Sequence, residues 1–413
     1  MYPRGKQMHV TRRRTAVVAM AMGAVLIAAA CGSSSKTPAS GSTTTTTPSS
    51  SSVSLTPASL TADFSAMAQL KSIAAKGKGL IGVLLPDTTS SARYESYDRP
   101  YLKQAFEAAG LSSSQFKVDN AQGSATTMQT QAEADITNGA SVLLIDALDS
   151  GSGAAIEASA KSKGVAVIDY DRLTKGGPAD RIYVSFDNVN VGKFIGKGEV
   201  DCITAWNVKK PNILVMDGDA TDNNAKLFAQ GYNGILKPFF DKGTYVKVGE
   251  PAGTWTPAIA ATNFEQQYTA HPNINAVITP NDDNANAVIA QLQKLHIKAK
   301  TFPTTGQDAS PVGLQNILKG FQCGTVYKPI TAEAQAAAAI AIYLRAGETP
   351  PAGLLNGTTR DTQANKDVSS VLLIPKWVTA DNMETTVIKD KWITPSALCI
   401  SAVAQACTAA GIK

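Results

Sequence analysis

Histidine is almost absent from this chain. Only His9, His271 and His296 occur in 413 residues, and the five cysteines show no spacing typical of a zinc site. No cofactor-binding motif stands out either. We therefore expect neither a metal nor a cofactor in the folded protein.

Excess positive charge is also scarce once the N-terminus is set aside. The formal net charge is +5, and the five basic residues Arg4, Lys6, Arg12, Arg13 and Arg14 lie in the first 14 positions. The remainder of the chain is close to neutral and shows no basic patch. Because nucleic-acid binding normally needs such a patch, a nucleic-acid partner is excluded.

No apolar run reaches the length of a comfortable membrane span near the N-terminus. Residues 16–30 form an apolar stretch of 15 residues, whereas a transmembrane helix needs about 20. Small side chains end this stretch directly before Cys31. Residues 1–30 therefore resemble a bacterial lipoprotein signal peptide, after which Cys31 is acylated, although Ala28 stands where leucine is usual. An ordinary cleaved leader is the alternative.

Residues 31–57 are poor in large apolar side chains and rich in Ser, Thr, Pro and Ala. Such a segment cannot bury enough apolar surface to offset the entropy lost on ordering. It predicts a disordered tether. A lipid on Cys31 and this tether would place the folded part at the outer, extracytoplasmic face of the cell membrane.

Four further cysteines, Cys202, Cys323, Cys399 and Cys407, follow the tether. An even number in an exported chain predicts disulfides, and three pairings are possible. The local pair, Cys399 with Cys407, is excluded if both lie on one continuous helix, because eight residues rise about 12 Å.

The remaining chain, about 355 residues, exceeds what one hydrophobic core supports, so two lobes are expected. In the first half, short apolar runs alternate with helical patterns. The expected strands are 79–86, 141–146, 165–170 and 182–186, and the expected helices are 97–109, 126–138 and 153–163. This alternation predicts parallel sheets covered by helices on both faces.

The second half repeats the rhythm. The expected strands are 212–217, 245–248, 276–279, 302–306, 323–328 and 370–375, and the expected helices are 225–240, 257–270, 285–295, 310–319 and 332–345. We predict an α/β fold of two doubly wound parallel-sheet lobes joined by a three-strand hinge. The N-terminal lobe comprises 58–186 plus 329–365, and the C-terminal lobe comprises 187–328 plus 366–413.

The apolar runs end in Asp, Asn, Arg and Lys, and no residue there is suited to act as a catalytic base. In an α/β sheet, ligands bind outside the carboxyl ends of the strands. A cleft between two lobes is a common place for a small ligand. The pattern therefore favours a binding protein for a neutral, polyhydroxylated molecule over an enzyme.

Six motifs occur at these strand ends in a consistent order. They are "YDR" (170–172), "YVSFDN" (183–188), "DNNAKLF" (222–228), "GQDA" (306–309), "TVYKPIT" (325–331) and "TVIKD" (386–390). With them, residues 79–391 resemble the D-xylose-binding proteins of sugar ABC transporters. The resemblance implies the type I periplasmic binding protein fold.

The same resemblance implies a set of ligand-binding residues. They are Arg93, Tyr94, Asp171, Arg172, Asn223, Asn224, Trp255, Asn281, Asp308 and Lys328. A sugar hydroxyl both donates and accepts, so Asp acceptors beside Arg, Lys or Asn donors can satisfy it. Of the paired asparagines, Asn224 is preferred. Trp255 would stack on the sugar ring, and Tyr94 stands where the family has tryptophan, which affects which sugar fits.

Each assignment has a structural alternative. Asp171 and Arg172 can form a surface ion pair, and one residue of the Asn223–Asn224 pair can cap a helix. Asp308 can cap the helix that begins near residue 310. The remaining alternatives are a loop role for Asn281, a solvated hinge position for Lys328, and ordinary packing for Tyr94 and Trp255.

The resemblance implies a solute-binding protein, monomeric and not an enzyme. It would capture a monosaccharide, xylose or similar, and deliver it to ABC permease subunits. Its lobes would close about crossovers near 186–190, 328–331 and 360–370. One rival is a sugar-sensing receptor with the same site. The other is a secreted glycoside hydrolase using Asp171 and Asp308, which nearby cations disfavour by keeping both carboxylates ionised.

Overall fold

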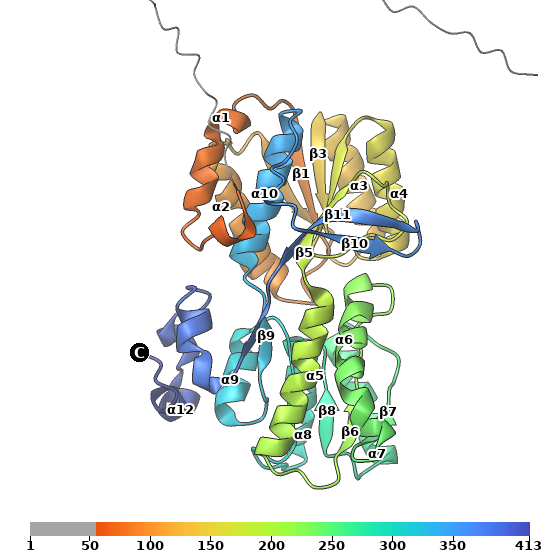
Figure 1. The fold of residues 1–413 in the computed structure, drawn as a ribbon, viewed down its shortest axis with the longest axis vertical. Coiled ribbons are helices and arrows are strands. Elements are labelled where there is room, and N and C mark those ends of the chain that lie inside the picture. Colours follow the sequence, from red (N-terminus) through yellow and green to blue (C-terminus); the bar gives the residue numbers. More distant parts are fainter. Residues whose placement is uncertain (1–54) are drawn as a thin grey trace, which may run out of the picture. The chain divides into compact units, whose positions relative to one another are not determined.

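The computed structural model describes residues 55–413 (Figure 1). The expected signal peptide, Cys31 and nearly all of the expected tether lie outside the described residues. Within 55–413, no helix combines the length and hydropathy needed to cross a bilayer.

A seven-stranded sheet forms the first lobe. Its spatial order is β10-β11-β5-β4-β3-β1-β2, and all neighbours are parallel except β10 and β11. The strands are β1 (Leu80–Leu85), β2 (Phe116–Asn120), β3 (Ala140–Ile145), β4 (Ala166–Tyr170), β5 (Ile182–Phe186), β10 (Gly357–Asp361) and β11 (Lys366–Leu373). The prediction missed β2 and β10, the two edge strands, because exposed and half-exposed residues interrupt any apolar run in them.

Helices cover both faces of this sheet, as the continuous apolar strands predict. One core joins Val83, Val142 and Ile168 to α2 (Arg99–Ala108) and to α10 (Ile330–Arg345), which lies across the strands (Figure 1). The other core joins Leu84 and Leu143 to α3 (Ala125–Thr137) and α4 (Ser150–Ser162). Neighbouring strand residues thus enter opposite cores.

The second lobe contains a smaller sheet of order β7-β6-β8, all parallel. The strands are β6 (Asn212–Val215), β7 (Val246–Gly249) and β8 (Ala276–Ile278). Isolated bridges, Val277 with Thr304 and Gln307 with Val326, extend it toward β9 (Thr325–Tyr327). The strand expected at 302–306 is thus reduced to a single bridge. β9 pairs antiparallel with β12 (Lys376–Val378).

Five helices flank these strands: α5 (Asn188–Ala205), α6 (Asn223–Asp241), α7 (Pro257–Ala270), α8 (Asp282–Lys294) and α9 (Pro311–Lys319). The prediction omitted α5, whose glycines weaken a helix pattern. At each of the three glycines a Cβ would lie within 3 Å of a neighbouring segment. A Cβ at Gly192 would lie 2.1 Å from the carbonyl oxygen of Phe228 on α6, so glycine permits the close packing of these two helices.

The chain passes between the lobes three times: from β5 into α5, from β9 into α10, and from β11 into β12. The third crossover lies at residues 374–375, so the predicted crossover near 360–370 and the lobe boundary at 366 are wrong. β11 pairs in parallel with β5, with Leu373 opposite Phe186. Its inward side chains, including Val371, are buried in the first lobe's core.

Short helices complete both ends of the described chain. Leu55 is buried, although the predicted tether extends to residue 57. The segments η1 (Pro57–Ser59), η2 (Ser65–Leu70) and α1 (Lys71–Ala74) precede β1. After β12 come η4 (Ala380–Asn382), η5 (Glu384–Ile388), α11 (Pro395–Leu398), η6 (Ser401–Val403) and α12 (Ala404–Ala409), and α11 and α12 pack against α9.

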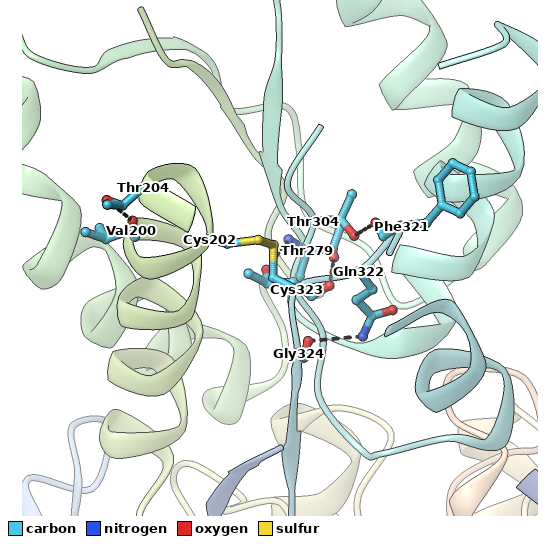
Figure 2. The surroundings of a disulfide bond; sticks show 10 residues. Val200, Cys202, Thr204, Thr279, Thr304, Phe321, Gln322, Cys323 and Gly324 are labelled. Carbon is cyan, nitrogen blue, oxygen red and sulfur yellow. Dashed lines mark hydrogen bonds between the residues drawn. A yellow bond between two sulfur atoms is a disulfide. The ribbon is translucent and has the colours of Figure 1, made fainter. Parts of the chain in front are cut away.

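Two disulfides are present among residues 55–413, which confirms the prediction from the cysteine count. Cys202 in α5 pairs with Cys323 just before β9, with their Cα atoms 5.8 Å apart (Figure 2). Cys399 pairs with Cys407. The local pair can form because the chain breaks between α11 and α12 rather than continuing as one helix.

Candidate functional site

A small cavity, of about 30 Å³, lies where the strand ends of the two lobes meet. Its lining comprises Ser90, Ser91, Arg93, Tyr94, Asp171, Arg172, Asp222, Asn224, Phe228, Trp255, Asn281, Gln307, Asp308 and Lys328. Every predicted ligand residue except Asn223 is in this set.

Asp171 follows directly on β4 and has a left-handed backbone, with φ of 56°. Its carbonyl oxygen accepts hydrogen bonds from the Tyr183 hydroxyl, the Ser185 hydroxyl and the Asn224 amide. Left-handed geometry is unusual outside glycine, and Asp tolerates it better than most residues. These three bonds hold the turn that presents the Asp171 carboxylate to the cavity.

Arg93 contacts this carboxylate and belongs to a buried network of ion pairs. Its guanidinium is 3.1 Å from Asp171, 2.6 Å from Asp98 and 2.7 Å from Glu333. Burial raises the pKa of Glu333 to about 8, against the opposing attraction of Arg93. Arg93 is therefore fixed in position by the residues of its own lobe.

The Asp171 carboxylate stays ionised. Burial acts to raise its pKa, but attraction by Arg93, Lys328 and Arg172 outweighs burial and holds the pKa below its usual value. Asp171 is consequently a permanent acceptor in the cavity and cannot serve as a proton-donating acid near neutral pH.

Tyr94 lies close to two guanidinium groups. Its ring centroid is 5.5 Å from the Cζ atom of Arg93 and 5.6 Å from that of Arg172. The Tyr94 hydroxyl accepts a bond of 3.0 Å from Arg172 and donates one of 3.3 Å to Asp171. Burial raises the pKa of Tyr94, so the hydroxyl is neutral. Tyr94 therefore orients two other predicted ligand residues.

Arg172 makes only long contacts with carboxylates. Its Nε atom lies 3.5 Å from both Asp146 and Asp222. Neither oxygen of Asp146 has a hydrogen-bond partner within the described part of the chain, and burial raises its pKa. Its shortest hydrogen bond is the one to the Tyr94 hydroxyl, and its bonds to the Ser90 hydroxyl and the Ala147 carbonyl are longer, at 3.3 Å and 3.4 Å.

An apolar wall on the second lobe consists of Trp255 and Phe228, whose rings meet edge to face at 6.5 Å. The Trp255 indole nitrogen donates to Asp222 at 3.0 Å, which fixes the ring. A Cβ at Gly218 would lie 2.3 Å from this ring, so glycine leaves it room. Trp255 therefore packs against its own lobe and also lines the cavity.

The helix caps decide several of the alternatives. Asp222 caps α6, and Ser310 caps α9, so neither Asn223, Asn224 nor Asp308 does. Asn281 caps α8 and also lines the cavity. Asn223 lines a neighbouring small pocket, whereas Asn224 lines the cavity.

Burial decides the others. Asp171 and Arg172 are buried, so the surface ion pair is wrong for this chain. Lys328 is only 3% exposed and is not a solvated hinge residue. Its Nζ atom lies 3.3 Å from Asp171 and 3.8 Å from Asp308.

Three direct hydrogen bonds join the loop after β1 to the second lobe at the cavity rim. The Ser91 hydroxyl donates to Asp308 at 3.0 Å, and the Asn281 amide donates to the Ser90 carbonyl at 3.2 Å. The Ala92 backbone N–H lies 3.4 Å from Asp283. The loop after β1 therefore touches the strand ends of the second lobe.

The sequence reading missed five lining residues: Ser90, Ser91, Asp222, Phe228 and Gln307. Asp222 and Phe228 lie within the "DNNAKLF" motif and Gln307 lies within "GQDA". These three residues could therefore have been predicted from the motifs. Ser90 and Ser91 lie in a loop without a strand or helix pattern. Their role depends on contact with the other lobe, which sequence does not reveal.

Charges in the lining balance. The cations are Arg93, Arg172 and Lys328, and the carboxylates are Asp171, Asp222 and Asp308. Such a surface matches an uncharged ligand that offers both donors and acceptors. Among the described residues, no cluster of His, Cys, Asp or Glu is arranged to hold a metal ion.

Comparison with known proteins agrees with this geometry. A family model described as a periplasmic binding protein domain matches residues 81–349. The D-xylose-binding periplasmic protein of Escherichia coli (strain K12) is 38% identical over 278 residues, which cover 66% of this chain and 80% of that protein. The multiple sugar-binding periplasmic protein SbpA of Azospirillum brasilense is 29% identical, with coverage of 78% and 91%.

A solved structure is similar over most of the fold. The ABC transporter solute binding protein from Clostridium phytofermentans, with bound β-D-glucose, superposes with a TM-score of 0.68. It is 27% identical, and the match covers 77% of this chain and 99% of that one. The likeness extends through both lobes.

Proposed function

Because the chain belongs to the periplasmic binding protein family, a family of substrate-binding proteins and not of enzymes, we propose that its cavity binds one uncharged monosaccharide, xylose or a similar sugar. The loaded protein would deliver this sugar to the permease of an ABC importer. The observation that carries the proposal is the charge-balanced lining contributed by both lobes.

The polar lining can satisfy sugar hydroxyls from two sides. Asp171 and Asp308 would accept hydrogen bonds, while Arg172, Lys328 and Asn224 would donate them. Hydrogen bonds to charged groups contribute about 1.5–3 kcal/mol each in a closed site. The remaining predicted residues, Arg93 and Asn281, are held by neighbours and would supply donors at the edges.

The apolar wall would contact the carbon faces of the sugar. Trp255 supplies a large, fixed aromatic surface, because its indole nitrogen is already bonded to Asp222. Tyr94 supplies a smaller ring whose hydroxyl is tied to Arg172. This chain has Tyr94 where the family has tryptophan. We expect this difference to change which sugar the protein prefers.

The affinity required is modest. A pentose has about ten heavy atoms, and micromolar binding corresponds to about −8 kcal/mol, or about −0.8 kcal/mol per atom. This value lies within the limit for very small ligands. The lobes would close about the three crossovers, and the closed form would dock on the permease.

We also propose that Cys31 carries a lipid that anchors the protein to the extracytoplasmic face of the membrane, and that the protein acts as a monomer. Support for the anchor comes from the small residues before Cys31 and the tether composition. Mass spectrometry of the N-terminal peptide tests the lipid. Cys31→Ala should move the protein from the membrane fraction to the soluble fraction, and unchanged fractionation would refute it.

A thermal-shift screen of pentoses, hexoses and polyols, followed by calorimetry, tests the ligand class. We expect a neutral monosaccharide to raise the melting temperature and to bind with micromolar or better affinity. Sugar acids and amino sugars of the same size are the matched controls, because they add a charge to a balanced lining. Preference for a charged analogue, or silence across the whole neutral panel, would overturn the proposal.

A further inference from the structure

The rings of Tyr97 and Trp392 stack across the two lobes. Their centroids are 3.6 Å apart and their planes differ by 18°. Tyr97 lies in η3 (Tyr94–Asp98), the turn that leads into α2 of the first lobe. Trp392 lies after β12, in the segment that packs on the second lobe, and is buried. The stack therefore forms only when the lobes are together.

Further rings continue the stack into each lobe. On the first side, Tyr97 lies 6.1 Å from Tyr101, which lies 6.0 Å from Phe64. On the second side, Trp392 lies 5.4 Å from Tyr327, the last residue of β9 before the second crossover. Tyr97 and Trp392 are the one pair in this row that joins the two lobes.

Both residues are next to segments that hold residues of the cavity lining. The Trp392 indole nitrogen donates to the Ala309 carbonyl at 2.8 Å. Ala309 and its neighbour Asp308 both have positive φ, 50° and 97°, so Trp392 braces the unusual backbone that presents Asp308. In η3, Asp98 binds the guanidinium of Arg93 beside Tyr94.

We propose that Tyr97 and Trp392 are positioning residues that form an interlobe clasp, one that stabilises the closed form and slows release of the ligand. The effect on ligand release rests on the proposed sugar-binding function. The contact between the lobes does not depend on it. When the lobes open, the two rings must separate and expose aromatic surface to water. The clasp therefore acts on closure without touching the ligand.

Stopped-flow binding of the sugar selected by the screen tests the clasp. In Tyr97→Ala we expect the dissociation rate constant to rise about fivefold to tenfold, as loss of one stacked aromatic pair implies. The association rate constant should change less than twofold, because encounter occurs with the open form. Tyr97→Phe retains the ring and should behave as the native protein.

A matched control separates the clasp from general loss of an aromatic contact. Phe239 and Tyr245 also stack, at 4.5 Å and 10°, but both lie in the second lobe. Tyr245→Ala should lower the melting temperature without changing the dissociation rate. If Tyr97→Ala folds poorly, Tyr97→Leu keeps apolar volume without the ring and should show the same faster release. Equal dissociation rates for native protein, Tyr97→Ala and Tyr97→Leu would overturn the clasp.

A measurement of the distance between the two lobes tests the clasp without any sugar, and so does not depend on the proposed function. Ser162 in α4 and Lys237 in α6 are exposed and lie in different lobes, so Ser162→Cys with Lys237→Cys can carry spin labels. Pulsed electron resonance should show longer distances in Tyr97→Ala than in the native background. Absence of binding by every sugar rejects only the proposed function. Identical distance distributions in the two backgrounds, measured without sugar, reject the clasp.

Discussion

The Nζ atom of Lys328 lies 3.3 Å from the Oδ1 atom of Asp171. Lys328 belongs to the second crossover, and Asp171 ends β4 of the first lobe. The same ammonium group lies 3.8 Å from Asp308 of the second lobe. One buried cation thus connects the hinge to the carboxylates of both lobes, and this links the position of the lobes to the charge pattern of the cavity.

Asp308 is the acidic residue by which we expect the second lobe to bind the sugar. Asp308→Asn should weaken sugar binding tenfold or more, at least about 1.4 kcal/mol, because a charged acceptor is replaced by a neutral amide. Asparagine tolerates positive φ, so the fold should persist. Asp308→Ala should weaken binding at least as much. Calorimetry that gives native affinity for both variants would reject the assignment.

Trp255 should report on binding through its fluorescence. A sugar placed against its ring would displace water, so we expect the emission spectrum to shift when the correct sugar is added. Trp206, Trp377 and Trp392 also emit. Trp255→Phe serves as the control and should remove most of the shift while retaining a ring. A shift of equal size in Trp255→Phe would show that another tryptophan reports instead.

The two disulfides should differ in their effect on stability. Cys202–Cys323 closes a separation of 121 residues, and Cys399–Cys407 closes one of 8. The loop-entropy relation assigns about 5 kcal/mol to the first and about 2.5 kcal/mol to the second. We therefore expect Cys202→Ser with Cys323→Ser to lower the free energy of unfolding more than Cys399→Ser with Cys407→Ser. Urea unfolding measures both, and the reverse order would contradict the argument.

Glu199 on α5 should make stability depend on pH. It is fully buried, neither carboxylate oxygen has a hydrogen-bond partner within residues 55–413, and burial raises its pKa. The folded state therefore holds a proton that the unfolded state releases near its ordinary pKa of about 4.5. Its contribution is complete below that pH and is lost as the pH rises toward the folded-state pKa, by up to about 1.4 kcal/mol per pH unit.

Glu199→Met removes the ionisable group and keeps a similar apolar volume. We expect this variant to be more stable than the native protein at pH 8 and to lose less stability between pH 5 and pH 8. Unfolding midpoints in urea at the two pH values give the comparison. Parallel pH profiles for the two proteins would mean that Glu199 does not titrate differently on folding.

Most of the α/β pattern could be predicted from the sequence because buried parallel strands are continuous apolar runs. The strand Ile182–Phe186 and the helix Pro257–Ala270 were predicted with the bounds that the structure has. The errors fall where this signal is weak. β2 is a half-exposed edge, α5 is interrupted by glycines, and β11 was assigned to the wrong lobe, since strand pairing is not encoded in local pattern.

Most of the candidate site could be predicted as well, because its residues follow strands within short motifs. Asp171, Arg172 and Lys328 are of this kind. The serines of the loop after β1 were not predicted, and no motif in the sequence marks Trp392. These residues act through contacts with segments far away in the chain: Ser91 with Asp308, and Trp392 with Tyr97.

The sequence by itself determined the class of fold, the number of lobes and the kinds of side chain available at the strand ends, because periodicity and composition are local properties. The tertiary structure alone decided which cysteines pair, where the third crossover lies and how the charges of the cavity balance. It also decided which rings meet between the lobes. Each of these depends on the distance between residues far apart in the chain. That distance is set by which strands pair, and strand pairing is not a local property of the sequence.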